Sequence, residues 1–482
     1  MAGLVRPDGA MSSSSPSSSS SSCVVAMGIV SAPEHVERRA ASRATWFRWP
    51  NVGVDGSKPI SAHFVVRTGA APPPIAQLVA AEQRAHGDVV PLADVPWNET
   101  RLRGPVLSVA AWFSFAARRL PSCAYVAKLD DDAYVHAPAL EKLLRQTLVT
   151  APHPERIYMG AFSWFHWMPR IFERSGFGWS YSMAWMLGRG CRNITSSEER
   201  CKWRGCGTCT GPFPFASGYL AILSTPLAAE VFATAPSAAP VLADDLARLR
   251  AATTLTTRTG GEQFKVMEDI WIGSLLYRQP PSRPVSYVAL SEKDDHTLVS
   301  DGWGLKVAES ALLVHSKNHQ RGVQTERFVA IDQFMRSSFC PLALQVRCDD
   351  GCRAFLTRNE AESAKKSETF REIWGARIDE APFCVSAQNG SAFCRVGSKG
   401  GLKAKPKLGS SGGGSGGIVC ARKPHDLIKQ RDMAVVERAM GILNETAYLR
   451  DLADAAMARA DPGGGAGASG RARTRGGRRK SK

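Results

Sequence analysis

An apolar run that ends in three consecutive carboxylates is the feature that most constrains this chain. The segment AYVAKLDDDAYV covers residues 124–135, and its apolar part predicts a buried strand that ends at Asp130, Asp131 and Asp132. Three carboxylates at one edge of a sheet repel one another unless a cation lies between them. Because side chains alternate along an extended chain, Asp130 and Asp132 point to the same side and can share one hard divalent ion. The pattern predicts Mg²⁺ or Mn²⁺ holding a diphosphate.

Strand and helix patterns alternate around this segment. Apolar runs predict buried strands at residues 23–30, 60–68 and 123–129. Apolar residues at helical spacing predict one amphipathic helix before the third strand and another directly after the aspartates. Their expected buried positions are Val106, Val109, Phe113 and Leu120, then Leu140, Leu143, Leu144 and Leu148. The alternation predicts an α/β fold with a Rossmann-like, doubly wound, mainly parallel sheet, whose ligands bind at the carboxyl edge of the strands.

Composition divides the 482 residues into parts. We expect an α/β domain at 23–340, a cysteine-rich, disulfide-braced extension at 341–397, a flexible Gly/Ser linker at 398–417 and a helical segment at 418–460. The serine-rich residues 1–22 and the Gly-rich basic tail 461–482 are expected to be disordered.

The region 160–211 is rich in Trp and Cys and predicts an elaborated loop region beside the site. Four of its indoles are candidate walls of the binding site: Trp164, Trp167, Trp179 and Trp185.

The net charge of +17 is concentrated outside the expected core. Seven cations lie in residues 471–482, and four more lie in the Gly/Ser-rich segment at Lys399, Lys403, Lys405 and Lys407. Basic tails of this kind are usually solvated appendages, so no nucleic-acid partner is expected.

Cysteines and sequons favour an oxidising compartment. The chain has 12 cysteines, and four of its seven asparagines, Asn98, Asn193, Asn389 and Asn444, stand in N-x-[ST] sequons, against about one expected from composition. Zinc, a redox pair and disulfides are the alternatives for Cys191, Cys201, Cys206 and Cys209, and disulfides are favoured. The apolar run at 23–30 is too short for a signal peptide or a membrane span, so we expect that the N-terminus is truncated.

Four motifs follow one another in a definite order. They are RRAASRATW from Arg38, KLDDDAYV from Lys128, PFPFASGYLAILS from Pro212 and MEDIWIG from Met267. Their order and spacing resemble the family 31 glycosyltransferases, the β-1,3-galactosyltransferase and N-acetylglucosaminyltransferase group, over about residues 23–320. Ser42 and the lack of the first glycine of GxGY depart from the family's pattern.

The resemblance implies a GT-A fold, a UDP-sugar donor, Mn²⁺ (or Mg²⁺) and inversion at the anomeric carbon. It implies that Asp130, Asp132 and, with less support, His315 bind the metal. It also implies that Asp269 is the catalytic base, with Glu268 as its partner. The nucleotide-binding residues it implies are Lys128, Asp130, Asp131, Gly218 and Tyr219. The guanidinium of Arg43 suits a diphosphate or a structural contact about equally.

Each motif also has a structural interpretation. Three aspartates are often a solvated turn, and Glu268 and Asp269 are favourable in the first turn of a helix. A lone His315 is most often a satisfied, half-buried histidine, and Gly218 with Tyr219 is compatible with a tight turn. The order of the motifs favours a site, and the two roles of the Glu268–Asp269 pair are compatible.

We therefore expect an inverting hexosyltransferase, with galactose as the first choice of sugar, acting through a β-1,3 bond on a glycoprotein or glycolipid. The resemblance implies the Golgi lumen and a membrane anchor that is not visible in this chain. The alternatives are N-acetylglucosaminyl or glucuronosyl transfer on the same fold, a non-catalytic glycan-binding or scaffold protein, and a nucleic-acid-associated protein that uses the basic tail.

Overall fold

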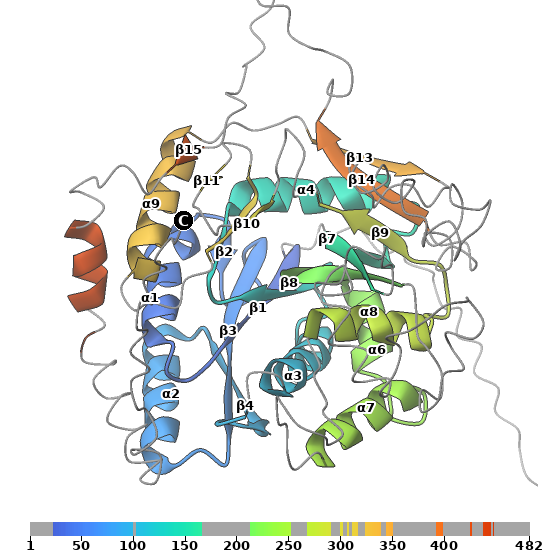
Figure 1. Ribbon diagram of the computed structural model, residues 1–482, viewed down its shortest axis with the longest axis horizontal. Coiled ribbons are helices and arrows are strands. Elements are labelled where there is room, and N and C mark those ends of the chain that lie inside the picture. The colour runs from blue at the N-terminus through green and yellow to red at the C-terminus, as the bar shows by residue number, and fades with distance from the viewer. Residues whose placement is uncertain are drawn as a thin grey trace, which may run out of the picture.

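The computed structural model describes one α/β domain with attached C-terminal segments (Figure 1). The described residues are 23–99, 103–165, 213–251, 268–290, 299–301, 306–307, 311–316, 323–338, 344–349, 392–398, 425–426, 437–444 and 447. Within these ranges, no helix is both long and apolar enough to cross a membrane.

A ten-stranded sheet runs through the domain. Its order is β13-β14-β9-β7-β8-β5-β1-β3-β2, and β4 also pairs with β3. Its strands, in chain order, are β1 (Val25–Ser31), β2 (Val52–Gly53), β3 (Ile60–Gly69), β4 (Val89–Pro96), β5 (Tyr125–Asp130), β7 (Ile157–Phe165), β8 (Phe213–Ser224), β9 (Ser286–Ala289), β13 (Leu344–Asp349) and β14 (Ala392–Ser398).

Most neighbouring strands of this sheet are parallel. The parallel pairs are β1 with β3 and β5, β3 with β2 and β4, and β9 with β7 and β14. Strand β8 is antiparallel to both β5 and β7, and β13 is antiparallel to β14. The predicted mainly parallel α/β sheet is confirmed.

Helices cover both faces of the sheet (Figure 1). They are α1 (Val36–Ala44), α2 (Pro73–His86), α3 (Arg103–Arg119), α4 (Ala137–Thr150), α6 (Thr225–Phe232), α7 (Pro240–Ala251), α8 (Glu268–Arg278) and α9 (Val323–Ser338), with a short 3₁₀ turn η1 (Trp46–Arg48). One apolar core includes residues of α1, α2, α4 and α9, and the other includes residues of α3, α6, α7 and α8.

Strand β5 shows how the alternation of side chains builds these two cores. Tyr125 and Ala127 belong to the core that contains α4, whereas Val126 belongs to the core that contains α3 and α8. By the same alternation Lys128 and Asp130 lie on the side of α3 and α8. The two expected helices are confirmed as α3 and α4, and the second begins at Ala137, after the short strand that follows the aspartates.

A small second sheet continues the chain beyond the aspartates. Strand β6 (Ala133–Val135) lies at the edge of the order β10-β12-β6, in which β10 is Val299–Asp301 and β12 is Leu313–His315. Strand β11 (Lys306–Val307) pairs with β15 (His425–Asp426), which brings a C-terminal segment onto the domain.

Two local predictions need correction. Residues 160–165, expected in a loop, continue strand β7, because they pair with residues of β8. Gly218 and Tyr219, for which a tight turn was considered, lie inside the 12-residue strand β8. The rest of the predicted loop region, 166–211, lies outside the described residues.

Disulfides join distant parts of the chain, as the cysteine content led us to expect. Cys23 and Cys123 precede β1 and β5 and are bonded to each other. Cys348 and Cys394 join β13 to β14, which extend the main sheet at one end. The residues Cys191, Cys201, Cys206, Cys209, Cys352 and Cys384 lie outside the described ranges.

Candidate active site

The aspartate triplet forms the corner between two sheets. Strand β5 ends at Asp130, and β6 begins at Ala133. Strand β6 pairs antiparallel with β12, which places His315 opposite Ala133. The backbone N–H of Ser316 donates to the carbonyl of Asp132 at 2.8 Å. Backbone pairing therefore carries His315 to the triplet from more than 180 residues away.

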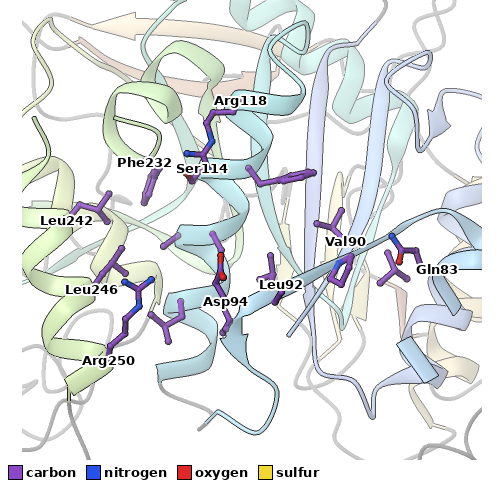
Figure 2. Close-up of a pocket in the computed structure, with 18 residues that line it drawn as sticks. Gln83, Val90, Leu92, Asp94, Ser114, Arg118, Phe232, Leu242, Leu246 and Arg250 are labelled. Carbon is purple, nitrogen blue, oxygen red and sulfur yellow. The ribbon is translucent and has the colours of Figure 1, made fainter. Parts of the chain in front are cut away.

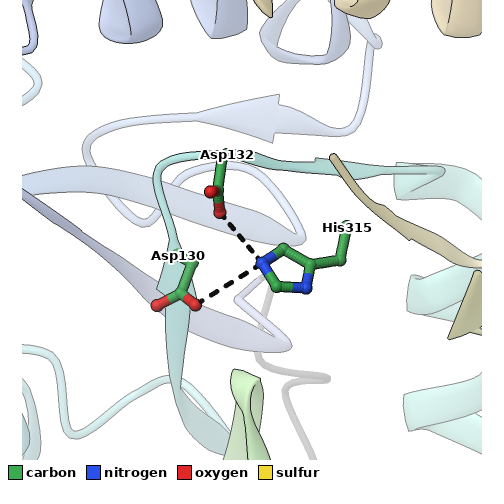
Figure 3. A group of neighbouring side chains, drawn as sticks. All are labelled: Asp130, Asp132 and His315. Atoms are coloured by element: carbon green, nitrogen blue, oxygen red, sulfur yellow. Dashed lines mark ion pairs between the residues drawn. The ribbon is translucent and has the colours of Figure 1, made fainter. Parts of the chain in front are cut away.

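Three side chains converge at this corner (Figure 3). His315 Nε2 lies 3.1 Å from Asp132 Oδ1 and 3.9 Å from Asp130 Oδ2. One ligand atom from each of the three residues lies within 4.8 Å of the other two. The residues predicted as metal ligands are thus brought together in one group that could hold a cation.

The chemistry of this cluster fits a divalent cation. Two carboxylates and one imidazole are ligands that Mn²⁺ accepts, and Mg²⁺ also binds carboxylates. Burial raises the pKa of Asp130 to about 6, the charges of Asp132 and Glu268 act in the same direction, and Lys128 opposes them. The Asp130 side chain is still 31% exposed, which leaves an approach for an ion and its ligand.

Asp131 points away from this cluster and is held by three side chains. Its Oδ2 accepts from Ser31 Oγ at 2.8 Å and lies 2.7 Å from His35 Nδ1, and its Oδ1 accepts from Arg38 Nη1 at 2.5 Å. Burial opposes ionisation, but His35 and Arg38 outweigh it and hold the pKa of Asp131 well below its usual range. These three contacts of Asp131 thus hold the corner between the two sheets in place.

Lys128 connects three of the four motifs. Its Nζ donates to Asp130 Oδ1 at 2.5 Å, to Glu268 Oε1 at 3.0 Å and to the carbonyl of Gly218. The side chain is 1% exposed. Burial alone would lower the pKa of Lys128, but Asp130 and Glu268 more than offset it and raise it. Since an ammonium has three donors, protein oxygens occupy all of them.

Glu268 and Asp269 open helix α8, as the structural interpretation predicted. Asp269 is 7% exposed, and its Oδ1 accepts from the N–H of Ile270 at 2.7 Å. Burial, followed by the charge of Glu268, raises the pKa of Asp269 to about 7. A carboxyl group with that pKa can take up and release a proton near neutral pH.

A bulge in β8 brings Gly218 to these carboxylates. Between the Gly160–Ala221 and Phe162–Ala216 pairs the register shifts, because β8 has more residues there than β7. A Cβ at Gly218 would lie 3.2 Å from Glu268 Oε1, 3.5 Å from Asp269 Oδ2 and 3.7 Å from Lys128 Nζ. The glycine therefore allows the strand to pass close to both acids, and bulges of this kind often occur at active sites. The neighbouring Tyr219 ring lies 5.0 Å from the His315 ring.

The structure does not bring Arg43 to this site. Its three guanidinium nitrogens donate to Glu82 and, in a bidentate pair, to Asp88, each at 2.7 Å. Glu82 also receives two hydrogen bonds from Arg39, and both members of that pair are 0% exposed. Of the two roles considered for Arg43, these contacts favour the structural one.

Sequence reasoning missed Arg38, His35 and Ser31, which contact the middle aspartate. The signal was present in the spacing of helix α1. His35 and Arg38 are three residues apart and both contact Asp131, whereas Arg39 and Arg43 are four apart and both contact Glu82. Because helical neighbours lie three or four residues apart, the first motif can be sorted into one arginine for the site and two for the core.

Other features lie apart from the site. A groove of about 560 Å³ runs between β4, α3 and α7, and it contains none of the predicted site residues (Figure 2). Of the four candidate indoles, Trp164 lies in β7, whereas Trp167, Trp179 and Trp185 lie outside the described residues. Their contact with a sugar stays a prediction.

Comparison with known proteins agrees with the motifs. Residues 37–252 match the model of the galactosyltransferase family. The match makes this part of the chain similar to that family. The matched segment contains the first three motifs, the aspartate triplet and Gly218, and Glu268, Asp269 and His315 follow it in the sequence.

Curated relatives of this domain are β-1,3-glycosyltransferases by name. Mouse beta-1,3-galactosyltransferase 6 is 30% identical over 139 residues, covering 29% of this chain and 40% of the relative. Human acetylgalactosaminyl-O-glycosyl-glycoprotein beta-1,3-N-acetylglucosaminyltransferase is 33% identical over 129 residues, covering 25% and 30%. Human N-acetyllactosaminide beta-1,3-N-acetylglucosaminyltransferase 4 is 32% identical over 133 residues, covering 27% and 32%. The chain thus spans less than half the length of these relatives.

Solved structures give only a slight likeness. A glycosyltransferase involved in the glycosylation of the major capsid of PBCV-1 matches with a TM-score of 0.28 and 14% identity, covering 64% of this chain and 98% of that one. Mouse xyloside xylosyltransferase 1 matches with a TM-score of 0.30 and 12% identity, covering 61% and 97%. We draw nothing further from likenesses at this level.

Proposed function

We propose that this protein is an inverting, metal-dependent hexosyltransferase that moves a sugar from a UDP-sugar to an acceptor hydroxyl. One observation carries the proposal. The buried ammonium of Lys128 joins Asp130 of the cation-ligand cluster, which also contains Asp132 and His315, to Glu268, the neighbour of Asp269 in the sequence. The joined groups lie at the carboxyl edge of β5, beside a bulge that admits only a glycine without crowding.

The cluster would hold a divalent ion through Asp130, Asp132 and His315. A bound cation supplies Lewis-acid stabilisation of the charge that develops on a departing diphosphate. The 31% exposure of Asp130 leaves an approach for the donor, whereas Asp132 and His315 are nearly buried at 11% and 7%. This arrangement supports the use of Mn²⁺ or Mg²⁺ with a nucleotide-sugar.

Asp269 is the proposed base. An acceptor hydroxyl is a weak nucleophile until its proton is removed, and a carboxylate within hydrogen-bond reach can take that proton as the bond to the sugar forms. The raised pKa of Asp269 matches this task near neutral pH. Lys128 fixes the adjacent Glu268 at 3.0 Å and so defines the start of helix α8, from which Asp269 projects.

The names of the relatives support the choice of donor sugar and of the bond that is formed. Galactose is the first choice of sugar, since the family model and one relative are named for it, and a β-1,3 bond is the first choice because the three relatives are named for it. N-acetylglucosamine is supported by two other relatives, and glucuronic acid is a further alternative on the same fold. The acceptor is proposed to be a glycan on a glycoprotein or glycolipid.

A donor screen tests the proposal directly. The protein is incubated with Mn²⁺, simple β-linked acceptors and a panel of UDP-sugars, and released UDP is measured. Acceptor-dependent UDP release with UDP-galactose is the expected result, and release with another UDP-sugar alone would reassign the donor. The absence of acceptor-dependent release with every donor would favour a non-catalytic glycan-binding or scaffold protein.

The Golgi lumen is the proposed compartment. The disulfides Cys23–Cys123 and Cys348–Cys394 support an oxidising environment. The sequon residues Asn98 and Asn444 are both exposed, as an attached glycan requires. Treatment of protein from secretory cells with an N-glycosidase should then increase its gel mobility, and unchanged mobility would count against passage through the lumen.

The basic tail is proposed to be dispensable for turnover. Removal of residues 461–482 should leave sugar transfer unchanged, because none of the proposed site residues lies there. Loss of transfer on truncation would instead support the nucleic-acid-associated alternative.

A further inference from the structure

The first motif contains two arginines that compete for a role in binding a diphosphate. Arg43 has no nitrogen to spare, since all three of its guanidinium nitrogens bind Glu82 or Asp88. It also covers the ring of Phe64, with its guanidinium carbon 4.8 Å from the ring centroid. Its guanidinium is thus held by two carboxylates that are 0% and 4% exposed, and among the described residues no contact joins it to the cation-ligand cluster.

Arg38 stands in a different position, at the edge of the cation-ligand cluster. Its Nη1 lies 2.5 Å from Asp131 Oδ1 and 3.9 Å from Asp132 Oδ2. The carboxylates of Asp131, Asp132 and Asp130 offset the burial of its guanidinium and raise its pKa. Arg38 is therefore a permanent positive charge beside a proposed metal ligand.

The guanidinium of Arg38 has donors in reserve. It carries five N–H groups in a fixed fork, and among the described residues its side chain makes no hydrogen bond other than the one to Asp131. The side chain is 16% exposed, and within that part of the chain none of its nitrogens is buried without a partner. The remaining N–H groups therefore face solvent beside the cluster.

Asp131 gives this arginine a fixed direction. The same carboxylate also binds Ser31 and His35, and Ser31 Oγ accepts a further hydrogen bond from Arg39 at 3.0 Å. Arg38 is thus anchored at one end of its fork by a carboxylate that is itself held from two sides. A preorganised fork suits phosphate oxygens, which it can contact through two parallel hydrogen bonds.

We propose that Arg38, and not Arg43, binds the diphosphate of the nucleotide-sugar donor, with Asp131 as the residue that positions it. This inference rests on the proposed function and assigns a residue to the same site. A diphosphate and the three aspartates are all negative, so a cation between them leaves further negative charge to be balanced. Arg38 supplies that balance on the side of the cluster that adjoins Asp132.

Equilibrium binding of UDP and of uridine, both with Mn²⁺ present, tests the inference. For Arg38→Gln, we expect the affinity for UDP to fall roughly 10- to 100-fold, the usual effect of losing charge-assisted hydrogen bonds. The affinity for uridine, followed by ligand-observed NMR, should not change, because uridine has no phosphate. Arg38→Lys should fall between wild type and Arg38→Gln, since lysine keeps the charge and loses the fork.

Arg43→Gln on the same helix is the matched control. It should lower the unfolding temperature because Asp88 loses its bidentate partner and Glu82 keeps only Arg39, and it should leave the affinity for UDP unchanged. A loss of UDP affinity in Arg43→Gln with none in Arg38→Gln would reverse the assignment.

Titration with Mn²⁺ alone separates ligand binding from a purely structural effect. Arg38→Gln removes a positive charge beside the cluster, so Mn²⁺ should bind at least as tightly as in wild type. Weaker Mn²⁺ binding in parallel with UDP would mean that Arg38 acts only by shaping Asp132, and it would overturn the inference. If wild type binds UDP and Arg38→Gln binds it equally well, the inference alone fails. If wild type binds no UDP with Mn²⁺, the proposed function fails with it.

Discussion

At the scale of single residues, the three neighbouring aspartates have different partners. Asp130 and Asp132 face His315, whereas Asp131 faces Ser31, His35 and Arg38. Burial raises the pKa of Asp130, and the charges of Asp132 and Glu268 act in the same direction, whereas His35 and Arg38 outweigh burial and lower the pKa of Asp131. Asp130 and Asp132 therefore face the proposed ligand, whereas Asp131 holds the triplet in place.

Asp269→Asn should abolish transfer and leave nucleotide binding intact. Loss of a positioned base typically lowers kcat by about 10²- to 10⁴-fold. Because the base must be deprotonated and its pKa is raised to about 7, kcat/KM of the wild type should fall as the pH drops below about 7. The residual activity of Asp269→Asn should lack this acidic limb. Rate measurements from pH 5 to 8 would contradict the assignment if the limb persists in the variant.

Lys128→Met should destabilise the fold. The substitution leaves Asp130, Glu268 and the carbonyl of Gly218 without their shared donor. The expected loss is about 2–3 kcal/mol of unfolding free energy, less than for a wholly buried pair, because the two acids are 31% and 17% exposed. Urea denaturation measures the change, and Lys142→Met at an exposed position is the control. Equal stability of the two variants would contradict the role given to Lys128.

At the scale of secondary-structure elements, helix α1 is attached to helix α2 by buried charges. Arg39 and Arg43 both bind Glu82 of helix α2. A fully buried pair is costly to break from one side, since the remaining charge has no partner. The position of α1, and with it Arg38, therefore depends on Glu82.

Acid should weaken this attachment. Although burial raises the pKa of Glu82, Arg39 and Arg43 outweigh it and lower the pKa from 4.5 to about 2. A lowered carboxyl pKa stabilises the fold above the unfolded value, and this stability is lost as the pH falls from 4.5 to 2. The linked contribution is roughly 3 kcal/mol. Unfolding temperatures measured between pH 5 and 2.5 should therefore fall less steeply for Glu82→Gln than for wild type.

Glu141→Gln serves as the control for this acid series. Glu141 forms an exposed ion pair with Arg145 on one helix, which contributes little to stability. Its pH dependence should follow that of wild type. A pH dependence of Glu82→Gln that also follows wild type would contradict the role of the buried pair.

Some of these elements could be predicted from sequence and others could not. Strand β5, helices α3 and α4 and the acidic start of α8 follow from local periodicity and were correctly predicted. The bulge at Gly218 and the pairing of β12 with β6 were not, because they depend on which distant strands meet. The placement of His315 was therefore only an expectation of the family resemblance.

At the scale of the whole molecule, a disulfide joins the two central strands at the edge opposite the site. Cys23 and Cys123 are 100 residues apart in sequence and stand just before β1 and β5. Closing so long a loop in the unfolded chain stabilises the folded state by about 3–5 kcal/mol. The registers of β1 and β5, and so the position of Asp130 next to Val30, depend on the same pair of strands.

Replacement of both cysteines by alanine should therefore lower the free energy of unfolding by about 3–5 kcal/mol. Chemical denaturation of the double variant beside oxidised wild type measures the change. Reduction of the wild type should reproduce most of it. A double variant as stable as the oxidised protein would contradict the structural role of this bond.

The overall α/β architecture could be predicted from the sequence, whereas the pairing of distant strands and the contacts between distant residues could not. Alternating strands and helices predicted the two-sided α/β architecture, because each element buries its own apolar face. The two strands β13 and β14 were expected only as a cysteine-rich extension, since the pairing of β14 with β9 and of β13 with β14 is not encoded locally. Arg38 was missed because its partner, Asp131, lies 93 residues away in sequence.

The most direct test of the whole account is a calorimetric titration of the wild-type protein and Asp132→Asn with UDP, with Mn²⁺ and with a chelator. The account predicts UDP binding to the wild type that requires the metal, and loss of that binding in Asp132→Asn without loss of folding. UDP binding that persists under chelation, or that Asp132→Asn leaves unchanged, would contradict it.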